Sequence, residues 1–242
     1  MKSLEIPIIH EETRLKSVYE RRKAEIPKGR YSYSNAANLL GIQERERRVL
    51  ALLAKHSKLS LNEMKILEIG CGTGFWLREF IKWGARPENI VGLDLMPDRL
   101  EECRRLCPAE VTLKCGSASS IEMRDASFDL VLQSTVFSSV LDRATKHQIA
   151  GEMVRMLRSD GIILWYDFFM NNPNNPDVRG IRRSEITELF PECKVSSARI
   201  TLAPPLARFL APLSRVLCEA LAGLRIFDTH LLAVISKPGH DS

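Results

Sequence analysis

The sequence predicts an α/β protein built on a doubly wound, mostly parallel sheet of seven strands. Short apolar runs with strand character alternate along the chain with longer segments whose apolar residues recur at helical spacing. One of these strands breaks directly into a glycine-rich turn that leads into a helix, and such a turn leaves backbone N–H groups unpaired at the helix start. We therefore expect a binding site at the carboxyl ends of the strands.

Length and composition describe one globular domain with appendages. The chain has 242 residues, of which 45% are hydrophobic and 27% charged, and its formal net charge of +5 permits an anionic partner without requiring one. No apolar run reaches membrane-spanning length, and the start of the chain lacks the apolar core of a leader peptide, so we expect a cytoplasmic protein. The six cysteines lack metal-type spacing and are expected to be reduced thiols, with no metal site.

The central motif runs from Lys65 to Phe75. The buried strand Ile66–Ile69 carries one acid, Glu68, and is followed by glycines at positions 70, 72 and 74. Aromatic side chains then recur at helical spacing, at Trp76, Phe80 and Trp83. Glycine is favoured where the backbone turns with positive φ or where a ligand approaches the main chain closely.

The glycine spacing distinguishes two kinds of cofactor site. A dinucleotide fingerprint reads Gly-x-Gly-x-x-Gly, whereas this turn reads Gly-x-Gly-x-Gly. The stretch from Leu67 to Gly74 resembles motif I of the class I S-adenosylmethionine (SAM)-dependent methyltransferases. The resemblance covers residues 45–237 and also rests on Asp94 and the pair Phe128-Asp129. It implies a Rossmann-like methyltransferase fold with an antiparallel seventh strand, with helical N-terminal and late insertions, and with SAM as cofactor. An NAD-dependent oxidoreductase and a purely structural turn are the alternatives.

The remaining elements follow the same family order. Further strands are expected at 89–93, 111–115, 127–132, 162–166, 194–202 and 230–236, and helices at 43–56, 97–106, 147–157 and 182–190. Residues 158–161 are expected to form the turn that ends the helix at 147–157. Residues 46–242 would then form the methyltransferase domain, with a helical insertion at 204–228.

The resemblance implies a set of cofactor-binding residues along the strand ends. The glycine turn would cradle the cofactor, Asp94 would bind ribose, the two residues after it would pack on adenine, Arg99 would reach the rim of that site, and the ends of the third and fourth strands would complete it. The residues concerned are Glu68, Gly70, Cys71, Gly72, Gly74, Asp94, Leu95, Met96, Arg99, Gly116, Ser117, Ala118, Gln133 and Ser134.

The sequence departs from related enzymes at two places, one at the adenine contact and one on the acceptor side. Ser117 stands where many family members carry an acid that meets the adenine amine. The stretch Gln133–Phe137 lacks the Asn/Asp-Pro-Pro-aromatic motif of nucleic-acid amino-methyltransferases and the acid of metal-dependent catechol-type enzymes. We therefore expect no nucleic-acid substrate.

Residues 1–45 are polar and lack sustained apolar periodicity, which indicates an N-terminal arm. The arm is either a solvated segment packed partly on the core or a lid in which Tyr31 or Tyr33 closes over the cofactor. The insertion at 204–228 carries leucines at helical spacing and three arginines. We interpret it as a helix that caps the domain in preference to a membrane-surface or lipid-substrate helix.

A general base for the acceptor is expected at the strand ends. The candidates are Asp167, just past the fifth strand, and His230, at the start of the seventh. The loop 171–180 should face the acceptor.

A second resemblance, to small bacterial methyltransferases associated with glycan or polysaccharide synthesis, rests on three stretches: Trp165–Phe168, 172–180 and Arg225–His230. It implies methyl transfer to a small molecule or glycan, at a hydroxyl oxygen. The alternatives are a non-catalytic SAM-binding regulatory protein and a methyltransferase for a lipid or quinone-type acceptor. Peripheral contact with a membrane is compatible with this sequence, whereas the acceptor atom and oligomeric state are not encoded in a readable motif.

Overall fold

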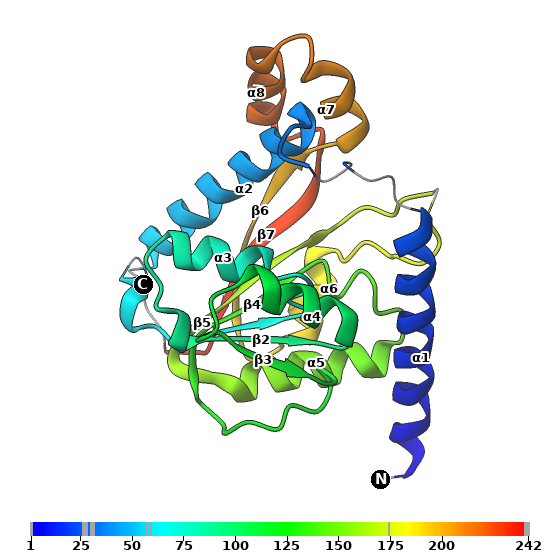
Figure 1. The fold of residues 1–242 in the computed structure, drawn as a ribbon, viewed down its shortest axis with the longest axis vertical. Coiled ribbons are helices and arrows are strands. Elements are labelled where there is room, and N and C mark those ends of the chain that lie inside the picture. The colour runs from blue at the N-terminus through cyan, green and yellow to red at the C-terminus, as the bar shows by residue number, and fades with distance from the viewer. Residues whose placement is uncertain are drawn as a thin grey trace.

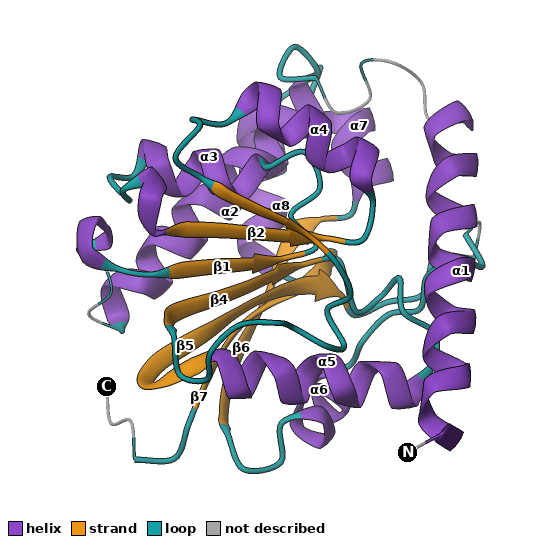
Figure 2. Ribbon diagram, turned by 60° about the horizontal axis from the view of Figure 1, so that its bottom comes forward, coloured by secondary structure: helices purple, strands orange, loops and turns teal. Residues whose placement is uncertain are grey.

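The fold is seen in a computed structural model that describes residues 2–25, 29, 32–56, 58, 60–173 and 175–239, with the backbone alone for residues 2–9. One seven-stranded sheet has the order β3-β2-β1-β4-β5-β7-β6, and β7 runs antiparallel to both neighbours (Figures 1 and 2). The predicted fold class is confirmed. The strands are β1 (Ile66–Ile69), β2 (Ile90–Asp94), β3 (Thr112–Cys115), β4 (Phe128–Ser134), β5 (Leu157–Phe168), β6 (Lys194–Leu202) and β7 (Asp228–Ser236).

Helices cover both faces of the sheet (Figure 2). They are α1 (Lys2–Glu25), α2 (Ala36–Lys55), α3 (Phe75–Lys82), α4 (Pro97–Leu106), α5 (Arg143–Met156), α6 (Arg183–Leu189), α7 (Pro204–Leu210) and α8 (Arg215–Leu224). One core cluster joins α2, α3 and α4 to the sheet, and a second joins α5 and α6 to the opposite face. Short 3₁₀ turns at Leu61–Glu63 and Pro87–Asn89 precede β1 and β2.

The central strands are buried on both sides, as their continuous apolar runs predict. All four residues of β1 are buried, and Ile66 is in register with Leu130 of β4, which is in register with Ile162 of β5. Each fully buried side chain of this kind contributes about 1.5–3 kcal/mol relative to exposure. This rigid centre fixes the strand ends that carry the candidate site.

The prediction of a turn at residues 158–161 is wrong, because these residues belong to β5, which begins at Leu157. Leu157 pairs with Phe128, and the register then shifts before Leu130 pairs with Ile162. Arg158 lies beside β4 and donates to Asp129 at 2.7 Å, and Asp160 lies 3.8 Å from Lys58. Asp129 also accepts from the Lys65 N–H at 2.7 Å and is structural, as predicted.

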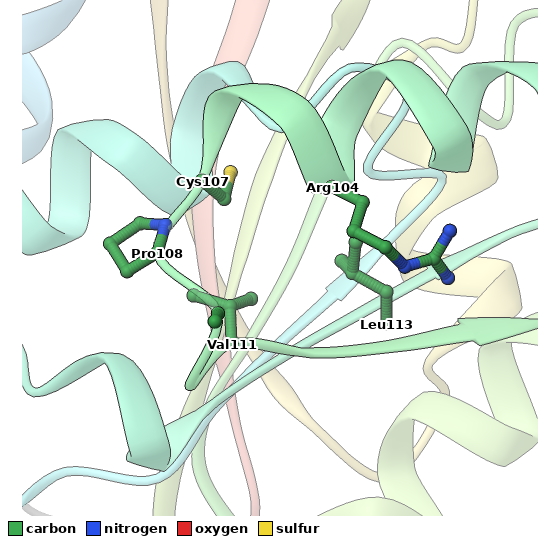
Figure 3. A pocket seen from close by; sticks show the side chains of 6 residues that line it. Arg104, Cys107, Pro108, Val111 and Leu113 are labelled. Atoms are coloured by element: carbon green, nitrogen blue, oxygen red, sulfur yellow. The ribbon is translucent and has the colours of Figure 1, made fainter.

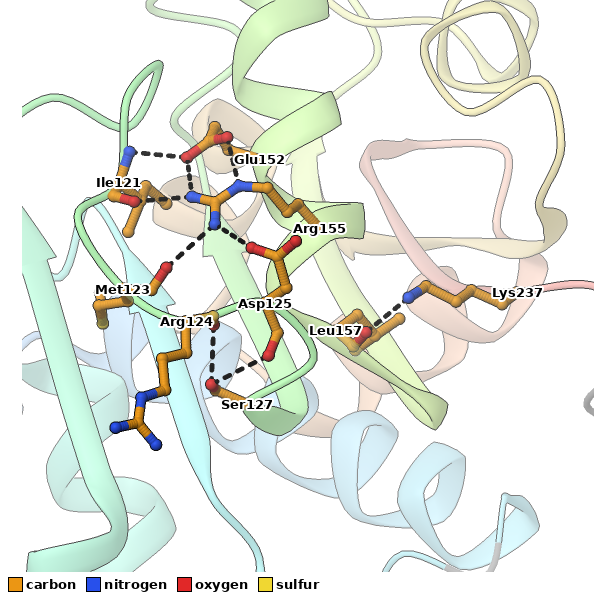
Figure 4. A network of polar contacts seen from close by, with 9 residues as sticks. All are labelled: Ile121, Met123, Arg124, Asp125, Ser127, Glu152, Arg155, Leu157 and Lys237. Carbon is orange, nitrogen blue, oxygen red and sulfur yellow. Dashed lines mark hydrogen bonds and ion pairs between the residues drawn. The ribbon is translucent and has the colours of Figure 1, made fainter.

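A polar network ties α5 to the loop that precedes β4 (Figure 4). Arg155 donates to Glu152, to Asp125 and to the backbone carbonyls of Ile121 and Met123. The buried end of α5 thereby holds a loop that has little apolar content of its own.

The N-terminal arm contains α1, a helix of 24 residues, which agrees with the helical N-terminal segment expected for this fold. Polar contacts hold it where an apolar stripe would usually do so. Glu11 is buried, binds Arg14 at 2.7 Å and accepts from the Leu141 N–H at 2.6 Å, while Arg14 donates to the Ser139 carbonyl. Apolar periodicity in the sequence does not mark a helix that is held in this way.

The insertion forms two helices where one helical segment was expected. The break follows from Pro212, which cannot continue a helix, and Ser214 caps α8 by accepting from the Leu217 N–H at 3.2 Å. Ala207, Leu210 and Cys218 pack with Leu202 of β6, and α7 lies against α2. The insertion therefore covers one end of the domain.

Candidate functional site

The glycine turn has the backbone that its sequence predicts. Gly70, Gly72 and Gly74 have φ of +69°, +54° and +75°, conformations that other residues adopt only with strain. The N–H groups of Gly70 and Cys71 both donate to the Leu93 carbonyl, at 2.7 and 3.0 Å. A Cβ on Gly70 would lie 2.5 Å from a methyl group of Val136. The turn is thereby fixed between β2 and the loop after β4.

Asp94 connects this turn to the next helix. One carboxylate oxygen accepts from the Gly72 N–H at 2.7 Å, and the other accepts from the Met96 N–H at 2.9 Å. Asp94 is buried at the carboxyl end of β2. Each of its oxygens retains a second acceptor position, which is what ribose hydroxyls require.

Glu68 is a buried carboxyl with an unsatisfied atom beside the glycine turn. Only 2% of the residue is exposed, and its Oε2 has no hydrogen-bond partner. Burial raises the pKa of Glu68 well above its usual range, and nearby Cys103 and Asp94 raise it further. A buried acid of this kind suits a cationic ligand group such as the ammonium or sulfonium of SAM, so the residues present fit that cofactor.

The end of β3 adjoins this site. The Gly116 N–H donates to the Asp94 carbonyl at 3.0 Å, which brings Gly116, Ser117 and Ala118 beside the end of β2. The Ser117 hydroxyl lies 2.7 Å from that of Ser119 and accepts from the Ser119 N–H at 3.2 Å. Ser117 thus shapes its own turn, and Met96 is buried at the start of α4.

Arg99 and α1 border the glycine turn. A Cβ on Gly72 would collide with the Arg99 guanidinium, so this side chain covers the turn. The guanidinium of Arg99 also lies over the ring of Tyr19, with 5.1 Å from Cζ to the ring centroid. Next to it, Lys23 of α1 binds Asp98 at 2.8 Å. Sequence reasoning missed Tyr19, because nothing in the helix pattern marks it.

The turn after β4 closes the site toward the middle of the sheet. Gln133 is fully buried; its side chain accepts from the Val136 N–H at 3.1 Å and donates to the Tyr166 carbonyl at 3.4 Å. Ser134 is half-buried beside it, and Thr135 adopts a φ of +58°. Gln133 thereby fixes the loop that approaches Gly70.

The two candidate bases lie on opposite faces of the sheet. Asp167 pairs with Leu231, whereas His230 pairs with Phe168, and neighbouring positions along a strand point in opposite directions. Asp167 is fully buried and accepts from the Ser138 and Phe168 N–H groups at 3.1 and 2.8 Å. Burial raises the pKa of Asp167 to about 6, although these hydrogen bonds oppose the rise.

His230 is an aromatic packing partner. Its ring stacks on Tyr166 with 4.7 Å between centroids and 5° between planes, and its Nδ1 lies 2.9 Å from the Thr229 hydroxyl. Burial lowers the pKa of His230 to about 3, with a contribution from the charge of Arg45. The imidazole is therefore neutral at physiological pH.

The three stretches that carry the glycan-associated resemblance converge at the end of β5. The Phe169 N–H donates to the Thr229 carbonyl at 3.1 Å, and the Ile181 N–H donates to the Phe168 carbonyl at 2.7 Å. The loop 171–180 is also held by Arg179, whose N–H donates to the Ser138 carbonyl at 2.8 Å. Segments far apart in sequence thus form one continuous rim.

Arg45 is a further residue that sequence reasoning missed. Its guanidinium lies over the rings of Phe75 and Tyr166, at 5.5 and 5.4 Å from their centroids. It therefore bridges the start of α3 and the end of β5. The predicted lid residue Tyr33 is 55% exposed, and Tyr31 lies outside the described residues.

A cavity of about 940 Å³ opens beside this rim. Its walls come from the residues after β5, the start of α6 and the facing part of β6 and β7, and its charged lining residues are Arg179, Arg182, Arg183, Arg199 and Glu185. A smaller cavity of about 250 Å³ lies between the last turn of α4 and β3, lined in part by Cys107, Pro108 and Val111 (Figure 3). That cavity is at the opposite end of α4 from Asp98 and Arg99, so it is not part of the candidate site.

The sheet order, the glycine turn and the acids at the ends of β1 and β2 define a class of enzyme. The chain is a class I SAM-dependent methyltransferase, and SAM is its cofactor. Residues 66–161 match the family model described as a methyltransferase domain.

Curated relatives are methyltransferases with several acceptors. The chain is 28% identical to the ubiquinone/menaquinone biosynthesis C-methyltransferase UbiE of Citrifermentans bemidjiense, over 67% of this chain and 68% of that protein. It is 30% identical to the sterol 24-C-methyltransferase of Aspergillus fumigatus over 49% of this chain. It is 28% identical to the 2-methyl-6-phytyl-1,4-hydroquinone methyltransferase of Synechocystis over 43% of this chain. The chain spans 32% and 31% of the last two proteins.

Solved structures share the fold. A SAM-dependent methyltransferase from Archaeoglobus fulgidus superposes with a TM-score of 0.55 at 16% identity, covering 82% of this chain and 98% of that one. A SAM-dependent methyltransferase from Mesorhizobium loti superposes with a TM-score of 0.56 at 16% identity, covering 76% of this chain and 97% of that one.

Proposed function

We propose that this enzyme transfers the methyl group of SAM to a hydroxyl oxygen of a small-molecule or glycan acceptor that carries an anionic group. The observation that carries the proposal is the large cavity beside the end of β5, with four arginines and one glutamate in its lining. Glu185 binds Arg179 at 2.9 Å and the buried Lys146 at 2.8 Å, so it is neutralised within the protein. The remaining guanidinium groups suit the planar, bidentate recognition of a phosphate or carboxylate.

The cofactor roles expected from the sequence become part of this proposal. Glu68 would bind the cationic methionine part of SAM, and the turn Gly70–Gly74, with Cys71, would cradle it. Asp94 would bind the ribose. The adenine would lie among Leu95, Met96, Gly116, Ser117 and Ala118, with Arg99 at the rim, while Gln133 and Ser134 would face the methyl group. The burial of Glu68 and Asp94 and the fixed glycine turn support these roles.

The N-terminal residues 1–45 would act as a lid on the domain at 46–242. Support comes from three contacts of α1 with the carboxyl edge of the sheet: Tyr19 with Arg99, Lys23 with Asp98, and Arg21 with Asp177 of the loop 171–180. A helix that bridges the start of α4 and this loop spans both the cofactor side and the acceptor side. Closing it would exclude water from the reacting groups.

The chemistry needs an oxygen held in line with the sulfonium methyl group, and positioning supplies most of the rate. SAM supplies the methyl group, and no metal is required for the displacement. Of the two candidate bases, Asp167 is favoured, because a pKa near 6 suits proton removal at neutral pH, whereas a histidine with a pKa near 3 is a weak base. Asp167 would either take the acceptor proton or orient the Ser138 turn that meets the acceptor.

A second candidate acceptor is an apolar, quinone-type molecule. Two relatives are named for quinone or hydroquinone methylation and a third for sterol methylation. The exposed apolar side chains of α7 and α8 also favour contact with lipid-like material.

Methyl-labelled SAM with the purified enzyme would test the proposal. The acceptors would be polar metabolites and glycans in one arm, and quinols and lipids in the other, with products separated by anion exchange and identified by mass spectrometry. We expect the label on an oxygen of an anionic, hydroxylated product. The double variant Arg182→Gln, Arg199→Gln should raise KM for that acceptor without changing SAM affinity. Label confined to neutral, organic-soluble products would reject the anionic acceptor and favour the quinone-type one.

A further inference from the structure

Exposed apolar side chains are concentrated on the insertion between β6 and β7. Among the residues that the structure describes, seven of the eleven exposed large apolar side chains lie between positions 209 and 227. The most exposed are Val216 at 77%, Leu213 at 71% and Phe209 at 70%. We call the seven residues the α7–α8 surface: Phe209, Leu213, Val216, Leu217, Leu224, Ile226 and Phe227.

The α7–α8 surface is not the face that packs on the domain. Ala207, Leu210 and Cys218 are buried against Leu202 and α2, and they form the inner, apolar side of the insertion. The α7–α8 surface adds a second apolar side, which faces solvent. Both helices project beyond the end of the sheet, past α2, and leave their outer side open (Figure 1). A helix that is apolar on all sides is normally buried, and contiguous exposed apolar patches mark interaction sites.

The charges around this surface are mainly positive. Arg208, Arg215 and Arg225 lie within the insertion, and Glu219 is its only acid between positions 204 and 227. Glu219 binds Arg215 at 2.9 Å, so Arg208 and Arg225 carry the excess charge. Long arginine side chains beside exposed leucine and phenylalanine suit the boundary between anionic headgroups and acyl chains.

We propose that the α7–α8 surface docks the enzyme on a membrane that contains anionic lipid. The apolar side chains enter the headgroup–acyl boundary, and Arg208 and Arg225 contact the lipid phosphates. No described helix is long and apolar enough to cross a membrane, so the attachment is peripheral. A second copy of the chain is the competing occupant. It is disfavoured because a symmetric contact between identical surfaces would bring the same two arginines of each copy together.

Docking at this place orients the enzyme. The insertion follows the carboxyl end of β6 and precedes β7, so the docked surface adjoins the sheet edge that carries the acceptor rim. The proposal does not depend on the acceptor being a lipid, because it rests on the surface alone.

Vesicle flotation with the full chain tests the proposal. Vesicles of phosphatidylcholine are compared with vesicles that contain about a quarter phosphatidylglycerol, at low salt and at about 0.5 M salt. The test variants are Leu213→Ser with Val216→Ser, and Arg208→Gln with Arg225→Gln. Leu106→Ser is the matched control, since Leu106 is an exposed leucine at the end of α4. Melting temperature and SAM affinity verify that each variant is folded.

We expect the wild type and the Leu106 control to float with the anionic vesicles. The apolar double variant should lose at least about tenfold in apparent affinity, and the arginine double variant should bind as weakly as the wild type does at high salt. Equal binding by the apolar double variant and the wild type would overturn the proposal. So would an absence of vesicle binding by the wild type. A wild-type dimer that the double variant Leu213→Ser, Val216→Ser dissociates in sedimentation analysis would then identify a second copy as the occupant.

Discussion

The guanidinium of Arg99 lies between Gly72 and the ring of Tyr19, so the N-terminal helix contacts the side chain that covers the glycine turn. A cation–π contact of this kind contributes about 0.5–2 kcal/mol. Tyr19→Ala should therefore weaken SAM binding by roughly 2- to 30-fold while the melting temperature changes little. Titration calorimetry gives the affinity. Tyr33→Ala is the control, because Tyr33 is largely exposed, and a loss of affinity in that variant alone would move the lid to the segment after α1.

Gly72→Val tests whether the glycine turn holds the cofactor. At a φ of +54° a branched residue is strained, and its side chain would displace Arg99 from the turn. The variant should lose the rise in melting temperature that S-adenosylhomocysteine gives the wild type. Gly151→Ala is the matched control, because Gly151 lies in α5 with open space at its Cβ position. A normal ligand-induced rise in Gly72→Val would place the cofactor elsewhere.

Asp228 should make stability depend on pH. The residue is 2% exposed and both carboxylate oxygens lack a hydrogen-bond partner. Burial raises the pKa of Asp228 to about 6, with a further contribution from Glu44. A raised pKa means that the protonated form favours the native state, so its contribution is complete below about pH 4 and is lost as the pH rises through 6.

Asp228→Asn removes this titration. The variant should melt a few degrees above the wild type at pH 8, and the difference should shrink toward pH 4.5. Thermal melts across this range measure it. The same difference at every pH would show that the native carboxyl does not titrate in this window.

Asp167 and His230 can be separated by their pH profiles. Asp167→Asn should reduce turnover strongly and flatten the acid limb of the rate profile near pH 6, with SAM affinity retained. His230→Gln should leave the profile unchanged, because the native ring does not gain a proton in this range. Full activity with an unchanged profile in both variants would leave positioning as the only catalytic device.

The sequence could predict that the residues expected on the cofactor side lie together, because their determinants are local in sequence. Gly70, Gly72 and Gly74 follow one buried strand, and Asp94 ends the next, so parallel pairing alone brings them together. The same argument located Gly116 and Gln133 at the ends of β3 and β4.

The acceptor side depends on pairings that the sequence does not encode locally. The register between β5 and β7 places Asp167 and His230 on opposite faces of the sheet, and a shift of one residue would place them on the same face. Arg45 reaches Tyr166 from a helix more than a hundred residues away in the chain. The contacts that hold α1 were not predicted, because buried Glu11 and its partners take the place of an apolar stripe.

Methyl transfer by Asp94→Ala measures the central claim, that SAM bound at the ends of β1 and β2 supplies the transferred group. The change removes the proposed ribose contacts, worth roughly 1.5–3 kcal/mol each for bonds to a charged group, and it also removes the acceptor of the Gly72 and Met96 N–H groups. With methyl-tritiated SAM and a cell extract, the wild type should label an acceptor, and the variant should need at least about tenfold more SAM for half the maximal rate. An equal dependence on SAM concentration in the two proteins would contradict the account.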